Sequence, residues 1–213
     1  GEFTGQTGTK AFLNAVQNYP LLLKIQTNLY KCFITRAWEL GAPGGVAGFL
    51  HPEGVYDDPQ GGLLRKELYT RLQFRFQFGN EKKLFAEVGN MGRAFSINIY
   101  NMRQASKTFL SCANLFHPLT IDSSFSHDGA GSIPGIKDEY DNWDLRPHKN
   151  RILHINHDRL ALFAKLYDEP GTPPLQARLP VVHSEEIVSV LEKFAEQPRR
   201  LGDLGRTLSS AHA

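Results

Sequence analysis

The stretch "NLYKCFITRAWELGAPGGVAGFLHP", residues 28–52, decides the fold class of this chain. Asn28 is a favoured helix N-cap, and the apolar residues after it recur with helical spacing on one face: Leu29, Phe33, Ala37 and Leu40, with Tyr30, Ile34 and Trp38 widening the stripe. A Pro-Gly-Gly turn then ends the helix. The following "VAGFL" is too short for a helix and continuously apolar, which is typical of a buried strand. The stretch therefore predicts one helix–turn–strand repeat of a parallel α/β sheet.

The residues after this repeat continue the sheet and then change its direction. Residues 53–62 have the composition of a loop, and "GGLLRKELYTRL", residues 61–72, predicts a second helix with leucines on one side and Arg65, Lys66 and Arg71 on the other. The run "FRFQF", residues 74–78, alternates with period two, as a half-buried strand does. "KKLFAEV" and "RAFSINIY", separated by Gly-Asn-Met-Gly, predict two strands of a β-hairpin. The sequence thus favours an α/β fold class, in which a partial Rossmann-like sheet ends in an antiparallel hairpin.

The chain divides into four predicted segments. Residues 1–24 form a polar lead segment with a short helix over 10–17, and its first three residues resemble a cloning scar, so we expect an excised fragment. Residues 25–105 hold the sheet pattern. Residues 106–150 lack periodicity and predict a long loop region, of a length typical of functional or disordered loops. Residues 151–213 predict a small α+β extension, with a strand at 152–155, helices capped by Asp158 and Ser184, and a frayed tail.

Composition excludes several classes of protein. The 213 residues, 41% of them hydrophobic, are enough for one packed core. The net charge of +2 does not by itself indicate nucleic-acid binding, although local patches matter more than totals. No apolar run approaches the roughly 18 residues of a membrane span, and Cys32 and Cys112 are too few for a disulfide framework or a zinc cluster. We therefore expect a cytoplasmic protein without membrane contact.

The sequence lacks the motifs of common enzyme sites. Its isolated glycine pairs build neither a dinucleotide fingerprint nor a phosphate loop. Three histidines lie between positions 148 and 157, but no partner stands at a metal-ligand spacing. Ser184 beside His183 lacks a nucleophile-elbow motif and suits a helix cap better than a hydrolase triad. The residues by themselves predict no catalytic, cofactor-binding or metal-binding site.

Basic and aromatic residues interleave from position 74 to 107 and again from 143 to 151. Aromatic faces stack on bases, and lysine and arginine side chains contact phosphates, so the interleaving indicates a candidate DNA-binding surface. The alternative for the run 74–78 is an amphipathic strand with its phenylalanines inward and its arginine outward, and the alternative for Trp143 is a loop-anchoring role. The candidate DNA-binding residues are Lys82, Lys83, Arg93, Phe95, Tyr100, Arg103, Trp143, Arg146, His148 and Arg151.

Residues 25–100 resemble the back half of adenine-specific DNA methyltransferases. The resemblance rests on "TNLYKCFITRAWELGAPGGVAGFLHPEGVYDDPQGGLLRKELYTRL" and "LFAEVGNMGRAFSINIY". It is to the large single-chain type, as in type IIG restriction–modification enzymes and phage-defence methylases. In that family an Asn-Pro-Pro-Tyr motif closes one strand, and a helix, a Pro-Gly-Gly turn with a strand, a second helix and an antiparallel hairpin follow. The resemblance implies that residues 25–105 are the C-terminal half of a methyltransferase-like domain. It also implies a parent protein that transfers methyl from S-adenosylmethionine to the adenine 6-amino group in DNA.

The sequence departs from this family where the family's chemistry lies. It contains no Asn-Pro-Pro-Tyr, and the nearest string, Asn18-Tyr19-Pro20-Leu21, lacks the paired prolines. The family also needs a Gly-bearing strand–loop–helix for S-adenosylmethionine, and this sequence has none. We therefore expect no cofactor in this fragment, S-adenosylmethionine in the intact parent, and no activity of the fragment alone.

The resemblance also implies partners and a base-contacting residue. In the family the hairpin region carries a residue that helps to hold the flipped base, and aligning "AFSINIYN" points to Tyr100, with Phe95 and Arg93 as near candidates. For each of them, packing within the hairpin is the open alternative. The expected partners are DNA, through the parent protein, and the upstream half of the methyltransferase domain. A half-sheet exposes an edge, which favours a homodimer of the fragment. The alternative function is a non-catalytic nucleic-acid or protein interaction module.

Overall fold

The chain folds into a mixed α/β structure around one five-stranded sheet. A computed structural model describes residues 2–26, 28–86, 94–103 and 107–198. The strands lie in the order β1-β3-β2-β4-β5; β1, β2 and β4 run in one direction, while β3 and β5 run in the other. Their bounds are β1 (Val46–Pro52), β2 (Leu72–Gly79), β3 (Ala94–Asn101), β4 (Phe109–Leu115) and β5 (Leu153–Ile155). The predicted α/β fold class is confirmed.

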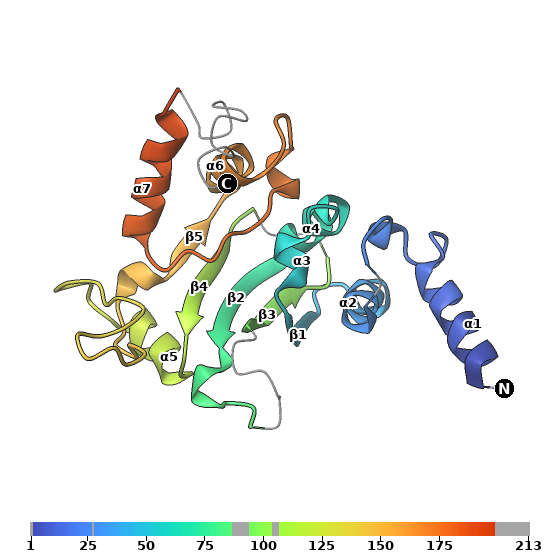
Figure 1. Cartoon of the computed structure of the whole chain (residues 1–213), viewed down its shortest axis with the longest axis horizontal. Coiled ribbons are helices and arrows are strands. Elements are labelled where there is room, and N and C mark those ends of the chain that lie inside the picture. Colours follow the sequence, from blue (N-terminus) through green and yellow to red (C-terminus); the bar gives the residue numbers. More distant parts are fainter. Residues whose placement is uncertain (1, 27, 87–93, 104–106, 199–213) are drawn as a thin grey trace, which may run out of the picture.

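Helices lie between and beside the strands (Figure 1). α2 precedes β1, α3 and α4 connect β1 to β2, α5 follows β4, and α6 and α7 follow β5, whereas α1 projects away from the sheet. The helices are α1 (Glu2–Asn14), α2 (Leu29–Leu40), α3 (Gly54–Asp57), α4 (Gly62–Tyr69), α5 (Leu119–Phe125), α6 (His157–Tyr167) and α7 (Glu185–Glu196). The 3₁₀ turns are η1 (Pro20–Leu22), η2 (Asn80–Lys82), η3 (Lys149–Arg151) and η4 (Pro174–Gln176).

The main hydrophobic core lies on one face of the sheet. Buried apolar residues of α2, α3, α4 and α6 pack there against the strands, and they include Trp38, Leu68, Tyr100 and Phe163. A smaller cluster, formed by Phe78, Cys112 and Leu115, lies on the opposite side. Burial of this apolar surface is the main favourable contribution to folding, at roughly 25 cal/mol per Å² removed from water. The two faces are thus covered to very different extents.

The less covered face is apolar and reaches the free edge of β1. Phe125 of α5 packs edge-on against the rings of Phe74 and Phe76, at 6.4 and 6.3 Å. Further along the same face, Val46 and Leu50 of β1 are 59% and 53% exposed. Among the described residues, β1 pairs only with β3, so its other edge is unpaired. An exposed edge beside apolar side chains is a ready surface for association.

This edge gives a first prediction. Replacing Leu50 by lysine is expected to lower self-association of the isolated chain in sedimentation velocity, because a charge on an edge strand opposes edge-to-edge pairing. Leu119 of α5, which is 63% exposed and lies away from β1, supplies the matched control. Equal effects of Leu50→Lys and Leu119→Lys would mean that the β1 edge is not the site of association.

The elements predicted from residues 28–72 are largely confirmed. Asn28 caps α2, and its side-chain oxygen accepts a hydrogen bond from the Tyr30 N–H at 3.4 Å. Leu64 and Leu68 of α4 are buried, as predicted, while Leu72 begins β2. Three points were wrong. β1 is not a buried strand of a parallel repeat, because it lies at the edge of the sheet, pairs antiparallel with β3 and has exposed residues at alternate positions. Residues 54–57 form the short helix α3, and Arg65 is buried, because its guanidinium donates to three backbone carbonyls.

The face of α2 that packs inward differs in part from the prediction: Ile34 and Trp38 of the predicted apolar stripe are buried, whereas other members are not. Leu29, Phe33 and Leu40 are 56%, 64% and 76% exposed. The buried face instead contains Lys31, Cys32, Ile34, Thr35 and Trp38. Two polar residues can lie there because the Lys31 ammonium pairs with the Asp58 carboxylate at 3.2 Å and the Thr35 hydroxyl donates to the Cys32 carbonyl.

The hairpin is present, but with different strands from those predicted. β3 pairs antiparallel with β2, from Leu72↔Tyr100 to Gly79↔Ala94. Residues 82–86 are not a strand, because the turn after β2 closes on itself through η2 and a left-handed Lys83 (φ 54°). The rest of the predicted strand, residues 87–88, lies outside the described residues.

The predicted loop region 106–150 contains regular elements that periodicity did not reveal. β4 runs parallel to β2, and α5 follows it. β4 mixes polar and apolar residues, and α5 spans only seven residues with an exposed polar side, so neither gives a clear periodic signal. The prediction of a region without elements is therefore wrong for residues 109–125, whereas the domain boundaries stay a prediction.

The terminal segments hold smaller corrections. α1 begins at Glu2 rather than at residue 10 and ends at Asn14. Asn156, not Asp158, caps α6, since its side chain accepts from the Arg159 N–H at 3.0 Å. Ser184 stands at the N-cap position of α7, as predicted, without a side-chain capping bond.

Candidate functional site

A pocket of about 550 Å³ opens at the carboxyl ends of β1 and β2. Ligands of open α/β sheets bind beyond the carboxyl ends of the strands, so a site is expected at this edge. Three segments form the wall: the end of β1 with the turn after it, the turn after β2, and the start of β3. The lining residues include Leu50, Pro52, Glu53, Asn80, Phe85 and Phe95.

Two phenylalanines, Phe85 and Phe95, line this pocket, and a third packs behind them. Phe78, at the end of β2, is buried and stacks on Phe95 with ring centroids 5.4 Å apart. Phe85 meets Phe95 edge-on at 5.0 Å and remains 41% exposed. The three rings thus lead from the smaller core to the pocket mouth, where Phe85 offers an aromatic surface to a ligand.

A buried polar layer lies behind the pocket. The Nδ1 atom of His51 is 2.8 Å from the Pro52 carbonyl, which can only accept, so Nδ1 carries the proton. Nε2 then accepts from the Tyr100 hydroxyl (3.0 Å) and the Asn98 amide (2.9 Å). Asn98 also accepts from the Tyr56 hydroxyl at 2.5 Å. The side chains of His51, Asn98, Tyr56 and Tyr100 thus form one connected hydrogen-bond network.

An ion pair continues this layer across the sheet. The Arg75 guanidinium of β2 bonds the carboxylate of Glu53, which follows β1, and also donates to the Ser111 hydroxyl of β4 at 3.1 Å. Its carbon lies 4.8 Å from the centre of the Tyr56 ring. The side chain of Arg75 is 1% exposed and that of Glu53 is 14% exposed. The strand 74–78 therefore has its arginine inward and Phe74 and Phe76 half-buried, the reverse of the amphipathic alternative.

Burial shifts the pKa of groups in this layer. Desolvation lowers the pKa of His51, and the charge of Arg75 lowers it further, against opposing effects of the Pro52 carbonyl and Glu53. Desolvation likewise raises the pKa of Tyr100 well above its ordinary value. Tyr30, which stacks on His51 at 5.5 Å, has its pKa raised to about 12 by burial and by nearby aspartates. At neutral pH all three groups are uncharged, so Glu53 and Arg75 hold the formal charges behind the pocket.

The candidate DNA-binding residues do not form one surface. Phe95 lines the pocket, and Lys82 and Lys83 stand exposed on the turn beside it. Tyr100 is fully buried, and His148 and Arg151 are buried as well, so these three have structural roles here. Arg103 is exposed at the opposite end of β3. Arg93 lies outside the described residues, and DNA contact by the exposed residues stays a prediction.

The Trp143 loop lies along the carboxyl edge of β4. The Trp143 ring packs on Phe116 at 4.5 Å, and the Lys137 ammonium lies 4.9 Å from its centre. This contact supports the loop-anchoring alternative. Arg146 is exposed but pairs with Asp144 at 2.6 Å. The loop also carries Asp138, Glu139 and Asp141, so its local charge does not favour phosphate.

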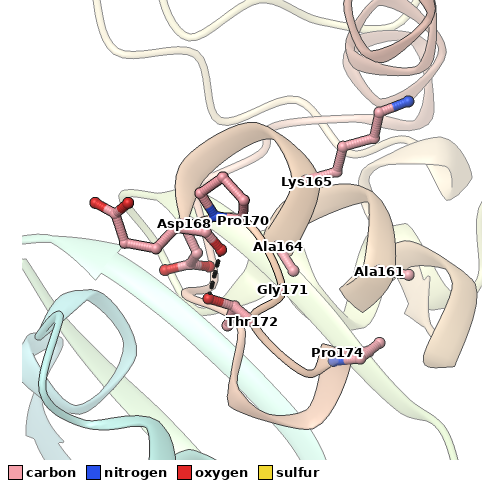
Figure 2. Close-up of a pocket in the computed structure, with 9 residues that line it drawn as sticks. Ala161, Ala164, Lys165, Asp168, Pro170, Gly171, Thr172 and Pro174 are labelled. Atoms are coloured by element: carbon pink, nitrogen blue, oxygen red, sulfur yellow. Dashed lines mark hydrogen bonds between the residues drawn. The ribbon is translucent and has the colours of Figure 1, made fainter.

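A second hollow, of about 510 Å³, lies at the C-terminal end of α6 (Figure 2). The Thr172 hydroxyl donates to the Glu169 carbonyl at 2.8 Å, which closes the turn that forms one wall. The Asp168 carboxylate accepts from the Arg178 side chain and backbone at 2.8 and 2.9 Å. Because these polar groups are engaged within the protein, the pocket beside Phe85 is the better candidate site.

The described part of the chain shows neither a metal cluster nor a membrane-spanning helix. Among the described residues, no three His, Cys, Asp or Glu side chains gather closely enough to hold a metal ion. None of the helices in the described ranges is long and apolar enough to cross a bilayer.

Sequence reasoning missed His51, Glu53, Arg75 and Asn98, the centre of the buried polar layer. A signal for this layer exists in "FSINIYN", where Ser96, Asn98 and Tyr100 share one face of β3. Three polar residues with period two indicate either an exposed face or a buried network. The run His51-Pro52-Glu53 at the carboxyl end of β1 supplies further polar side chains and therefore favours the buried network.

Comparison with solved structures finds chains of similar fold. The fold is similar to the M protein of the type I restriction enzyme EcoKI, with a TM-score of 0.43 and 14% sequence identity. The matched region covers 87% of this chain and 45% of that one, so this chain spans less than half of its length. No family model matches the sequence. No curated protein matches it either.

Proposed function

We propose that this chain belongs to an adenine-specific DNA methyltransferase of the large type IIG restriction–modification or phage-defence kind. Residues 25–105 are its C-terminal half-domain, and the pocket beside Phe85 receives the target base. The intact parent transfers methyl from S-adenosylmethionine to the adenine 6-amino group. This chain alone is inactive, because its sequence holds neither Asn-Pro-Pro-Tyr nor the Gly-bearing loop that the cofactor needs.

The observation that supports this proposal most is the uncovered surface at the β1 edge. The sequence predicts that Leu29, Phe33 and Leu40 of α2 are buried, yet all three are exposed, and so are Val46 and Leu50 of the adjoining β1. Exposed apolar residues on an edge strand and on the helix before it indicate surfaces that another element covers. In the family that this sequence resembles, the strand that ends in Asn-Pro-Pro-Tyr directly precedes a helix such as α2 and a strand such as β1. The upstream half of the methyltransferase domain is therefore the proposed partner at this edge.

The chemistry of the pocket suits a planar base. Its wall is mainly apolar, and Phe85 presents an exposed aromatic ring, while Lys82 and Lys83 stand on the same turn. An extrahelical base gains stacking energy on an aromatic side chain, and its flanking phosphates gain contacts with cations. Phe85 and Phe95 are thus the proposed base-contacting residues, and Tyr100 is instead the buried support behind them.

The residues of this chain do not fit S-adenosylmethionine. No Gly-rich loop follows any of the described strands, and the pocket holds no such loop in its wall. We therefore assign the cofactor to the upstream half and derive no chemical step from this chain. The decisive test is the reading frame upstream of this sequence: a frame that encodes neither the Gly-bearing loop nor Asn-Pro-Pro-Tyr would refute the proposal.

A binding titration tests the DNA surface directly. The logarithm of the association constant for duplex DNA is expected to fall linearly with the logarithm of the salt concentration, since each neutralised phosphate releases counterions. Replacing Lys82 and Lys83 by glutamine should reduce this slope by about 0.9 for each phosphate that the variant no longer neutralises. Replacing the exposed Lys66 and Lys193 removes the same charge elsewhere and should leave the slope unchanged. A salt-independent absence of binding by the unaltered chain would argue against the surface.

A non-catalytic interaction module is the second candidate. The absence of Asn-Pro-Pro-Tyr from the sequence favours it, since a protein that keeps the sheet without the motif can still bind DNA or another protein. The upstream reading frame separates the two candidates.

A further inference from the structure

The turn between β2 and β3 is built around one buried side chain. Asn80 is 2% exposed, and its amide pairs with the backbone of Phe85 twice: the oxygen accepts from the Phe85 N–H (3.0 Å), and the nitrogen donates to the Phe85 carbonyl (3.1 Å). The Asn80 carbonyl also accepts from the Lys83 N–H at 3.0 Å. An asparagine amide that makes both bonds replaces a strand partner for Phe85.

These bonds fix where the Phe85 ring stands. Lys83 adopts a left-handed conformation (φ 54°), which reverses the chain inside the turn. Phe85 then returns to the level of Asn80, and its ring meets Phe95 edge-on at the pocket mouth. Because Phe85 lies in no strand or helix, the Asn80 side chain supplies the bonds that regular structure supplies elsewhere.

The same turn presents two cations. Lys82 and Lys83 are exposed, and neither has an ion-pair partner within the described ranges. One six-residue turn, 80–85, thus carries Lys82, Lys83 and Phe85, and the side chain of its first residue, Asn80, closes it. An aromatic ring beside cations is the arrangement that binds single nucleotides of an unpaired strand.

We propose that Asn80 is the positioning residue of a nucleotide site, in which Phe85 stacks on an unpaired base and Lys82 and Lys83 contact its phosphates. This inference rests on the proposed function and adds the residue that orients the stacking ring. Asn80 touches no ligand itself; it acts through the backbone of Phe85. Loss of its side chain frees the ring while the two lysines keep their charge.

The test uses two fluorescent single-stranded oligonucleotides, one of adenines and one of the same length with abasic sites. Base preference is the ratio of their dissociation constants for the chain. Stacking on one aromatic ring predicts a preference of about 5- to 150-fold, which Phe85→Ala should abolish. Asn80→Ala should reduce the preference at least about fivefold and leave the salt dependence unchanged. The double variant Lys82→Gln, Lys83→Gln should weaken the salt dependence and leave the base preference unchanged.

Two variants separate positioning from general destabilisation. Asn156→Ala removes another side chain that bonds the backbone, at the start of α6, and should lower stability without changing base preference. Asn80→Asp keeps the acceptor for the Phe85 N–H and loses the donor, so an intermediate preference is expected. Hydrogen exchange at the Phe85 amide should accelerate in Asn80→Ala and not in Asn156→Ala.

The outcomes are distinguishable. If the unaltered chain shows base preference that Phe85→Ala abolishes and Asn80→Ala retains, the role of Asn80 is wrong and the proposed function stands. If the unaltered chain binds neither oligonucleotide, or binds both equally, the proposal that the pocket receives a base is wrong. The proposed role of Asn80 is then wrong as well.

Discussion

Replacing Arg75 by methionine is expected to lower the free energy of unfolding by about 3–5 kcal/mol, the usual result of breaking a buried ion pair from one side. The variant leaves the Glu53 carboxylate largely buried without its cation, and it leaves the Ser111 hydroxyl without its partner. Urea denaturation at neutral pH measures the loss. No other side chain in the described structure joins β2, β4 and the end of β1 in this way.

Two control variants test whether the loss of stability comes from the buried ion pair. Arg36 and Glu39 form an ion pair on α2 with side chains 58% and 50% exposed, so Arg36→Met should cost less than about 1 kcal/mol. The double variant Glu53→Leu, Arg75→Met removes both buried charges and should be more stable than Arg75→Met alone. If Arg75→Met costs no more than Arg36→Met, the pair does not hold the three strands together.

The burial of Arg75 also explains why sequence reasoning placed it outward. A charged residue can be buried when its partners are in place, and those partners are set by the fold rather than by neighbouring residues. Glu53 is 22 positions away from Arg75. The carbonyl of Gln176, which holds Arg65, is 111 positions away. Local periodicity contains no information about either contact.

The predictable part of the fold is the part with local signals. The Asn28 cap, the Pro-Gly-Gly turn and the run "VAGFL" predict where α2 and β1 lie in the sequence, because capping and turn chemistry act within a few residues. They do not predict that β1 is an edge strand paired antiparallel with β3. The face of α2 that turns inward is not local. Packing against η1 and β1 decides it, and this packing buries Lys31 and Thr35 in place of Leu29 and Phe33.

The candidate site shows the same division. The sequence interleaves aromatic and basic residues around Phe95, Lys82 and Lys83; the structure places Phe95 in the pocket wall and the two lysines, exposed, on the turn that also carries the lining residues Asn80 and Phe85. Tyr100 has the same pattern but faces the helices, because β3 alternates and even positions lie on the covered side. Asn80 has no pattern at all; its role depends on a turn whose conformation comes from Lys83.

Lowering the pH from about 7.5 to about 5.5 is expected to destabilise the folded chain, and His51 is expected to supply part of the effect. The folded environment lowers the pKa of His51 below the unfolded value of about 6.5. Below about pH 6.5, the unfolded chain binds a proton at His51 that the folded chain does not yet bind. Stability is therefore complete above about pH 6.5 and falls as the pH drops toward the folded pKa, by at most about 1.36 kcal/mol per pH unit for one histidine.

Comparison of variants assigns this effect to His51. His51→Gln should show a smaller loss of stability per pH unit between about pH 6.5 and 5.5, because the titrating group is gone. His183, whose pKa burial also lowers, contributes separately, so His183→Gln should remove a share of its own. An unchanged slope in His51→Gln would show that the buried layer accepts the proton without cost.

The physical reason for this sensitivity lies in the hydrogen bonds of His51. Nδ1 already donates to the Pro52 carbonyl, so a second proton must go to Nε2, where the Asn98 amide and the Tyr100 hydroxyl both point hydrogens. Protonation would face the new N–H with the Asn98 NH₂ group and would place a cation in a layer that already contains Arg75. Rotation of Asn98 would relieve the first conflict but would break its bond from Tyr56. The acid sensitivity of the fold thus originates in the buried hydrogen-bond network behind Phe95, so His51→Gln should lower it.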